Sequence, residues 1–103
     1  TAMVTYAIRD SEYNGIAIKQ GDIIGLHNGQ IAFSGKSVHD VVLEMMKKII
    51  TDEDELITIY YGADIQESDA QSITNEIESQ YDYCDVECHN GGQPLYYYLI
   101  SVE

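Results

Sequence analysis

Residues 56 to 89 constrain the fold most, because they have the pattern of a strand, a helix and a second strand. The stretch Leu56–Tyr61 is nearly continuous in apolar and aromatic residues, which is typical of a central strand covered on much of both faces. Ser68 followed by Gln71 predicts the start of a helix. Residues 85 to 89 have the composition of the next strand. Such a unit crosses over right-handedly and leaves its two strands parallel.

The first half of the chain predicts antiparallel strands and one helix. Short β-rich segments at residues 3 to 8, 15 to 19 and 21 to 26 precede Asn28-Gly29, a dipeptide that favours a type I′ hairpin turn, and a returning strand follows. A helix then begins at Ser37. Its apolar residues form one stripe that we expect to face the sheet: Val38, Val41, Val42, Met45, Met46 and Ile49.

Together these patterns predict a single α/β domain covering residues 1 to 103. Its sheet is mixed and carries two helices. An N-terminal β-meander with a hairpin precedes the right-handed βαβ unit, and a C-terminal edge strand beginning at Leu95 ends the chain. A domain of this length buries about two-thirds of its unfolded surface, so no disulfide or metal is needed to hold it.

Two polar loops that contain glycine are the candidate contact surface. Each follows one strand of the βαβ unit, and the carboxyl ends of parallel neighbours meet at the sheet edge where open α/β sheets bind ligands. Their candidate residues are Gly62, Asp64, His89, Asn90, Gly91, Gly92 and Gln93. Paired glycines permit positive φ angles and close approach by another molecule. The alternative is that Gly91-Gly92 only turns the chain and that Pro94 starts an edge strand.

Three further residues are candidates for partner contact. Arg9 follows the first strand in a chain with few basic residues, so it forms either a local ion pair or an anchor for a partner's carboxylate or phosphate. Asp10 stands next to it. Tyr97 is the middle one of three consecutive tyrosines, and strand alternation turns it away from the face of its neighbours. An outward tyrosine suits a binding surface.

The composition excludes some classes of partner. Eighteen Asp and Glu against five Lys and Arg give a formal net charge of −13, which repels nucleic acid and anionic membranes. This acidity indicates either a plain solvated surface or a docking face for a basic partner. No apolar run approaches the ~20 residues that span a bilayer, and the first residues lack a signal-peptide pattern. We therefore expect a cytoplasmic protein without membrane insertion.

The residue pattern predicts neither a metal site nor a catalytic site. Cys84, Cys88 and His89 are close in sequence, but a strand sends the last two to opposite faces, and no second ligand pair exists. Glycine-rich phosphate loops and the nucleophile-elbow motif are absent. Asp10, Asp64 and His89 could form an acid/base group, yet no nucleophile is indicated beside them. We expect no metal, no cofactor and no enzyme activity from this segment alone.

Two segments carry a family resemblance, residues 4 to 11 (VTYAIRDS) and residues 89 to 103 (HNGGQPLYYYLISVE). They resemble signature segments of the C-terminal domain of the bacterial fatty acid kinase catalytic subunit, which is a dihydroxyacetone-kinase-like (DAK/DhaL-domain) protein that works with a DegV-family acyl-binding partner. Residues 21 to 25, the Asn28-Gly29 turn, the acidic loop 52 to 55 and residues 57 to 62 fit in the same order. The resemblance covers essentially the whole chain, with Tyr97 at a position where the family usually has proline.

The resemblance implies a docking role. An N-terminal domain of such a kinase would bind ATP and magnesium and phosphorylate the fatty acid carboxylate that the partner presents, giving an acyl phosphate for phospholipid synthesis. This segment would be the non-catalytic C-terminal domain that binds the acyl-carrying DegV-family protein. It would also contact the rest of its own kinase subunit, with a homodimer formed through the full-length protein.

Two other functions stay open at this point. One is a small-molecule or nucleotide-binding α/β module that uses the loops after the parallel strands. The other is a structural or dimerising domain that pairs through its final strand.

Overall fold

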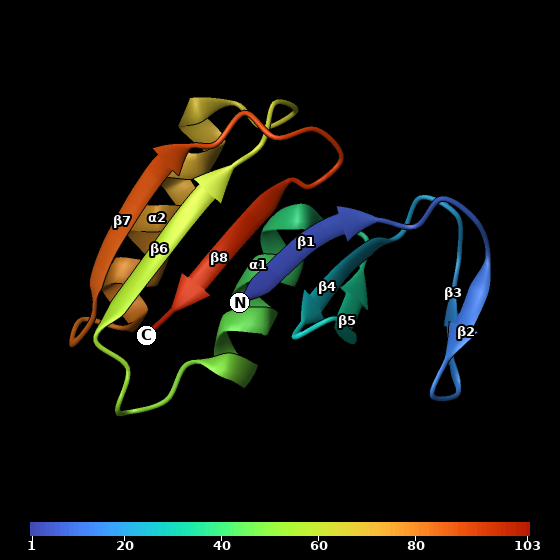
Figure 1. The fold of residues 1–103 in the computed structure, drawn as a ribbon, viewed down its shortest axis with the longest axis horizontal. Helices are drawn as coiled ribbons and strands as arrows, with labels where there is room; N and C mark the ends of the chain where they lie inside the picture. The colour runs from blue at the N-terminus through green and yellow to red at the C-terminus, as the bar shows by residue number, and fades with distance from the viewer.

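The computed structural model describes residues 1 to 103 and contains a six-stranded mixed sheet. The strand order is β5-β4-β1-β8-β6-β7, and a separate two-stranded sheet, β2-β3, stands beside it (Figure 1). The elements in chain order are β1 (Ala2–Tyr6), β2 (Ser11–Tyr13), β3 (Ile16–Ile18), β4 (Ile23–His27), β5 (Gln30–Gly35), α1 (Val38–Ile49), β6 (Leu56–Tyr61), α2 (Glu67–Gln80), β7 (Asp85–Asn90) and β8 (Tyr98–Val102).

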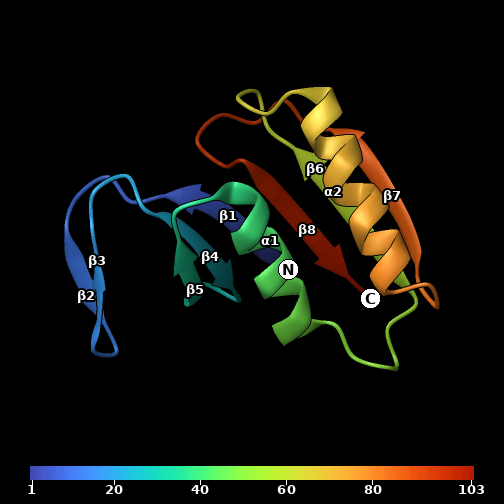
Figure 2. The ribbon, with the colours of Figure 1, turned by 180° about the vertical axis from the view of Figure 1, so that it is seen from behind.

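Both helices pack on the same face of the sheet and leave the other face uncovered (Figures 1 and 2). In β1, β6 and β8 the fully buried residues alternate with partly exposed ones, because successive side chains point to opposite faces. The core between the two layers includes Val4, Met45, Ile59 and Tyr98, none of which exposes any surface. The predicted stripe of α1 supplies four buried residues to this core, as expected.

The predicted strand-helix-strand unit is confirmed. β6 and β7 are parallel neighbours, with Tyr61 beside Asn90 at their carboxyl ends. In Figure 1, α2 passes behind the sheet and β7 lies to the left of β6, which makes the crossover right-handed. The helix begins at Glu67 after an N-cap residue that makes no side-chain hydrogen bond, so the capping box expected from Ser68 and Gln71 does not form.

The expected C-terminal edge strand is wrong in its position. β8 lies inside the sheet, antiparallel to β1 on one side and to β6 on the other. The strand begins only at Tyr98, so Pro94 remains in the preceding loop and removes no donor from the ladder. The edges are β5 and β7. The exposed acidic residues Asp85 and Glu87 of β7 discourage pairing of that edge with another chain.

The N-terminal strands do not form one continuous meander. β1 pairs directly with β4, whereas β2 and β3 pair only with each other and extend as a hairpin (Figure 1). The Asn28-Gly29 turn is as predicted, with φ angles of 53° and 82°. Asn14-Gly15 repeats it with φ angles of 50° and 80°. This second turn joins β2 to β3.

Asp22 accepts hydrogen bonds at the base of this hairpin, and these bonds predict how the stability of the fold depends on pH. Its carboxylate accepts from Lys36 Nζ at 2.6 Å and from the Lys19 N–H at 2.9 Å, and these two bonds, in that order, lower its pKa. A folded-state pKa below the unfolded value of about 3.9 means that the ionised carboxylate stabilises the fold above about pH 4. That contribution is lost as pH falls through the lower, folded pKa.

We therefore expect Asp22→Asn to lower the free energy of unfolding near neutral pH and to have little effect at about pH 2. Urea unfolding of both proteins across this range measures the difference. Asp82→Asn, a change of an exposed residue, serves as the control. A difference between Asp22→Asn and wild type that is the same at every pH would contradict the assignment.

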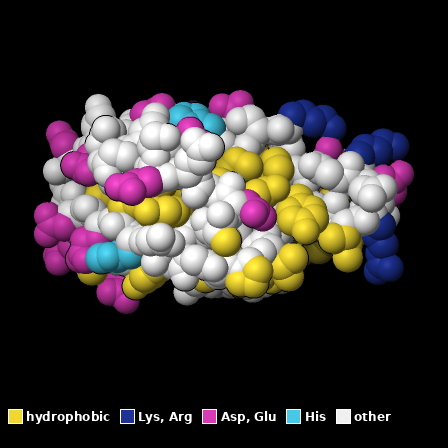
Figure 3. Space-filling view, turned by 90° about the horizontal axis from the view of Figure 1, so that it is seen from above, with side chains coloured by type: hydrophobic (Ala, Val, Ile, Leu, Met, Phe, Trp, Pro, Cys, Tyr) yellow, Lys and Arg dark blue, Asp and Glu magenta, His cyan; other side chains and the backbone are white.

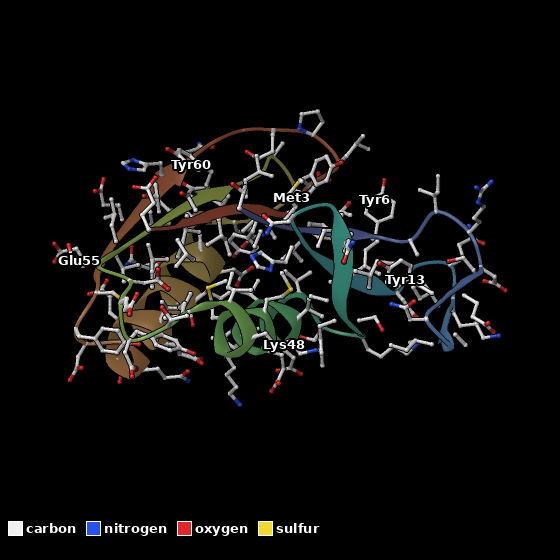
Figure 4. All side chains as sticks on the ribbon, turned by 60° about the horizontal axis from the view of Figure 1, so that its bottom comes forward. Met3, Tyr6, Tyr13, Lys48, Glu55 and Tyr60 are labelled. Atoms are coloured by element: carbon white, nitrogen blue, oxygen red, sulfur yellow. The ribbon has the colours of Figure 1, made fainter.

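An apolar row crosses the uncovered face of the sheet. Residues paired directly from strand to strand form it: Ile31, Leu26, Met3, Leu99, Tyr60 and His89, from β5 to β7. We call these residues the open-face row. Figure 4 shows Met3 and Tyr60 on the side of the sheet opposite Lys48 of α1. Because Tyr60 is 41% exposed, the row includes an accessible aromatic ring next to His89 of β7.

Candidate functional site

Parallel pairing of β6 and β7 joins the two predicted loops at one edge of the sheet. Gly91 and Gly92 both donate their N–H groups to the Tyr61 carbonyl, at 2.9 and 3.2 Å. Gly62 donates to the Tyr97 carbonyl at 2.8 Å, and Ala63 donates to the Gln93 carbonyl at 3.0 Å. Residues 62 to 64 and 89 to 97 therefore form one hydrogen-bonded unit, which we call the loop edge.

Gly62 is required at the loop edge because the backbone of the second loop closes over it. A Cβ atom at this position would collide with the carbonyl oxygen of Tyr96 and lie 2.8 Å from that of Gln93. A Cβ at Gly91 would meet the side-chain oxygen of Gln93. These two glycines therefore have a packing role, which sequence reasoning from positive φ angles did not identify.

The side chain of Gln93 stabilises the second loop by hydrogen bonds to backbone carbonyls. Its Nε2 donates to the carbonyls of Tyr60 and Tyr96, each at 3.2 Å. The side chain is half-buried. Its amide is thus engaged inside the protein, so Gln93 supports the shape of the loop edge rather than offering a free donor at its surface.

Leu95 is the most informative residue of the loop edge. Its φ of 70° lies in the left-handed region, which is costly for a leucine. Its side chain is 60% exposed, so burial in the core does not explain the conformation. Thr5 Oγ1, on the uncovered face of the sheet, donates to its carbonyl at 2.7 Å. Sequence analysis placed Leu95 at the start of the final strand and did not single it out, because it opens the aromatic and apolar run of residues 95 to 100.

His89 and Tyr60 form a second feature beside the loop. Their rings stack with centroids 5.6 Å apart and an interplanar angle of 30°. His89 Nε2 lies 3.2 Å from a carboxylate oxygen of Glu87 on the same strand. Asn90 is exposed at the end of β7. Tyr60, His89, Asn90 and Leu95 therefore present mixed aromatic, polar and apolar groups, a composition typical of protein contact surfaces.

Of the remaining predicted residues, Asp64 and Tyr97 belong to the loop edge, whereas Arg9 and Asp10 lie elsewhere. Arg9 and Asp10 are at the base of the β2-β3 hairpin, away from the loop edge (Figure 1). Asp10 accepts from the Gln20 N–H at 2.8 Å. Arg9 is exposed and forms no hydrogen bond or ion pair, so the local ion pair is absent. Asp64 is exposed. Tyr97 is half-buried, and the centroid of its ring lies 6.0 Å from that of Tyr6. Its side chain is therefore less exposed than the sequence predicted.

Charge is divided unevenly along the chain. All five Lys and Arg lie within the first 48 residues, where five acidic residues balance them, while residues 49 to 103 carry thirteen Asp and Glu and no Lys or Arg. Figure 3 shows the result on one face of the molecule: acidic side chains gather at the end formed by α2 and β7, and basic ones gather at the hairpin end. The loop edge belongs to the acidic half.

No group of three or more His, Cys, Asp and Glu side chains comes together as a metal site would require. Cys84 is buried and Cys88 is half-buried, and both are free thiols. Cys84 lies 3.2 Å from the Asp54 carbonyl, and burial, followed by the nearby carboxylates of Asp54 and Asp85, raises its pKa. This thiol stays protonated and packs as a core residue. Neither helix is long and apolar enough to cross a membrane.

Comparisons with known proteins agree on one family. The C-terminal domain of FakA-like fatty acid kinase subunits is the family that matches, over residues 1 to 103. A relative in Staphylococcus haemolyticus (strain JCSC1435), Uncharacterized protein SH1689, is 37% identical over 100 residues, which is 97% of this chain and 18% of the relative. Protein YloV of Bacillus subtilis (strain 168) is 34% identical over 103 residues, 100% of this chain and 19% of its own. The chain therefore spans about a fifth of these relatives.

Proposed function

The chain belongs to the family of C-terminal domains of FakA-like fatty acid kinase subunits, and from this we propose that it is a non-catalytic docking domain for an acyl-carrying DegV-family protein. The observation that carries the docking role is Leu95, an exposed leucine held in a strained conformation at the loop edge. Strain of this kind persists where the surrounding structure enforces it, and it clusters at functional positions such as active sites, ligand clamps and switch regions.

The surface around Leu95 has the chemistry of a protein interface. Tyr60, which stacks on His89 of the loop edge, adds an aromatic group, and Asn90 adds a polar one. Interfaces combine an aromatic or apolar centre with a polar rim and one or two anchor residues. In this proposal Leu95 and Tyr60 are the anchors, while Gly62, Gly91 and Gln93 keep the loop in shape.

The charge distribution supports a partner with a basic surface. The loop edge belongs to the acidic half of the chain, residues 49 to 103, which has thirteen Asp and Glu and no Lys or Arg. Opposite charges on two proteins raise their association rate, and salt weakens this effect. A partner with Lys and Arg around an apolar patch would match both the charge and the anchors.

The whole kinase subunit would then work as an ATP-dependent fatty acid kinase in the cytoplasm. A dihydroxyacetone-kinase-like domain outside this segment would hold ATP and magnesium and transfer phosphate to the fatty acid carboxylate, giving an acyl phosphate for phospholipid synthesis. The role proposed for this segment is to bring the acyl-carrying partner to that domain. Contacts with the rest of the kinase, including a homodimer of the full-length protein, belong to the same proposal.

Leu95→Gly tests the docking role by separating stability from binding. Glycine accepts a φ of 70° without strain, so we expect the free energy of unfolding to stay unchanged or rise by up to about 1 kcal/mol. Loss of the leucine side chain is expected to weaken binding of an acyl-loaded DegV-family protein from the same genome by about tenfold or more. Urea unfolding measures the first effect, and titration calorimetry at low and high salt measures the second.

Ile16→Ala is the matched control, because Ile16 is also an exposed apolar residue, at 53%, but lies on the hairpin. Its substitution should change the affinity for the partner less than about twofold. If wild-type protein does not bind the partner at either salt concentration, the docking role is wrong. If Leu95→Gly binds as tightly as wild type, docking through the loop edge is wrong.

A further inference from the structure

The uncovered face of the sheet carries apolar side chains where a face in water normally carries polar ones. Antiparallel strands with one solvated face alternate apolar and polar residues, whereas strands covered on both faces are apolar almost throughout. In β4, Gly25 lies beneath Met45 of α1, so Ile24 and Leu26 on either side of it lie on the uncovered face. The open-face row adds three more apolar residues, which are half-buried like these two: Met3, Ile31 and Leu99.

The same face lacks charge in a chain that is otherwise strongly acidic. Charged residues make up 22% of the chain, yet five adjacent strands, β5, β4, β1, β8 and β6, contain no Asp, Glu, Lys or Arg. In the six-stranded sheet only the edge strand β7 carries such residues, which are Asp85 and Glu87. Because charged side chains are mostly exposed, a solvated face of this protein should carry several. Their absence indicates a face that another surface covers.

A hollow of about 280 Å³ continues this apolar surface toward the β2-β3 hairpin. Ile24 and Ile31 of the uncovered face line it together with Tyr6 and Ile8, and Ile8 is 74% exposed. Contiguous apolar surface of this kind marks a site of interaction. The uncovered face lies across the two longest dimensions of the molecule, 38 and 28 Å (Figure 1). It therefore has room for the roughly 600–1,500 Å² that two domains of one chain bury between them.

The length of the relatives and the charge of the chain point to one occupant. This chain spans 18% and 19% of two relatives, so about four-fifths of each relative lies outside the match. A second copy is disfavoured, because a net charge of −13 on each copy makes two copies repel each other. A basic partner would seek the carboxylates of the acidic half rather than strands without charge. We propose that an apolar, uncharged surface of another domain of the same kinase subunit packs on the uncovered face, over Met3, Leu26, Ile31 and Leu99.

An intramolecular contact also suits the moderate hydrophobicity of this face. Interfaces between domains of one chain are more polar than those of obligate complexes, and Thr5 and Ser101 stand two residues from Met3 and Leu99 along their strands. A domain of the same chain is held at high effective concentration, so the contact need not bind a free partner tightly. This inference rests on the part of the proposed function that makes the segment one domain of a longer kinase subunit.

Methionine oxidation tests the proposal without any substitution. Met3 is on the uncovered face, whereas Met45 and Met46 are fully buried. The full-length kinase subunit that contains this segment, and the segment alone, are treated with hydrogen peroxide, and mass spectrometry follows each sulfoxide. Met3 should oxidise at least about fivefold more slowly in the full-length subunit than in the segment. Met45 and Met46 should stay slow in both, which also shows that the segment is folded. Equal oxidation rates of Met3 in the two proteins would overturn the proposal.

Two lysine variants give a second test within the full-length subunit. Leu26→Lys places a charge in the middle of the proposed contact, so the oxidation rate of Met3 should rise by about fivefold or more, while the rates of Met45 and Met46 stay unchanged. Ile16→Lys makes the same kind of change at an apolar residue of the hairpin that is 53% exposed, and it should alter the rate of Met3 less than about twofold. If Met3 stays protected in Leu26→Lys, the contact is not where we place it and the proposal is wrong.

Two further measurements distinguish other occupants. Protection of Met3 that appears in the segment alone and grows with its concentration would mean that a second copy covers the face. Protection of the full-length subunit that appears only after the acyl-carrying partner is added would mean that the partner covers it. Either result overturns the proposal. Because Met3 in the kinase subunit alone is read without a partner, failure of docking at the loop edge would leave the expected result unchanged, so the two proposals fail separately.

Discussion

Gly62→Ala is expected to lower the free energy of unfolding by about 3 kcal/mol. The added methyl group would collide with the Tyr96 carbonyl oxygen and would lie 2.8 Å from the Gln93 carbonyl oxygen. Both obstacles are backbone atoms, so no side-chain rotation can make room. The second loop would have to move away from β6, which breaks the bonds that Gly62 and Ala63 donate to it. Urea unfolding measures the loss.

Ala63→Ser is the control for this change. Ala63 is the next residue and is exposed, so its substitution should alter the free energy of unfolding by less than about 0.5 kcal/mol. Amide hydrogen exchange gives a second measure, since Gly91 and Gly92 donate to Tyr61 and should lose protection in Gly62→Ala. A stability of Gly62→Ala within about 0.5 kcal/mol of wild type would show that the two loops do not pack as described.

Local patterns predicted the elements of this fold better than their arrangement. The apolar run Leu56–Tyr61 and the stripe of α1 each indicated a buried element, because burial leaves a periodic trace in the sequence. No comparable pattern in the sequence indicated that β8 lies in the middle of the sheet. Pro94 suggested an edge strand, but the strand begins four residues later, and neighbour order depends on long-range pairing with β1 and β6.

In the candidate site, too, the sequence predicted which segments come together better than it predicted their detailed contacts. The rule that loops after parallel neighbours share a sheet edge brought Gly62 and Gly91 together correctly. The roles of individual residues were less predictable, because they depend on contacts between distant segments. Gln93 was expected at the surface, and its amide is instead held by the carbonyls of Tyr60 and Tyr96. The strain at Leu95 is a backbone angle, which a residue type alone does not reveal.

A double-mutant cycle between Gly25 and Met45 is expected to show strong coupling through the core. Gly25 is buried in β4 beneath α1, and a Cβ there would collide with Met45 Sδ and lie 2.6 Å from its Cγ. We expect Gly25→Ala to cost about 2 kcal/mol by overpacking and Met45→Ala to cost about 3 kcal/mol by leaving a cavity. In the double variant the new methyl group occupies part of that cavity.

The combined cost should therefore fall short of the sum of the single costs by at least about 1 kcal/mol, measured by urea unfolding. Met46 provides the matched control, since it is equally buried in α1, yet it is not among the atoms nearest to the Gly25 position. Gly25→Ala with Met46→Ala should be additive within about 0.5 kcal/mol. Additivity in both pairs would mean that Met45 does not occupy the space above Gly25, and that the close contact of α1 with β4 has another cause.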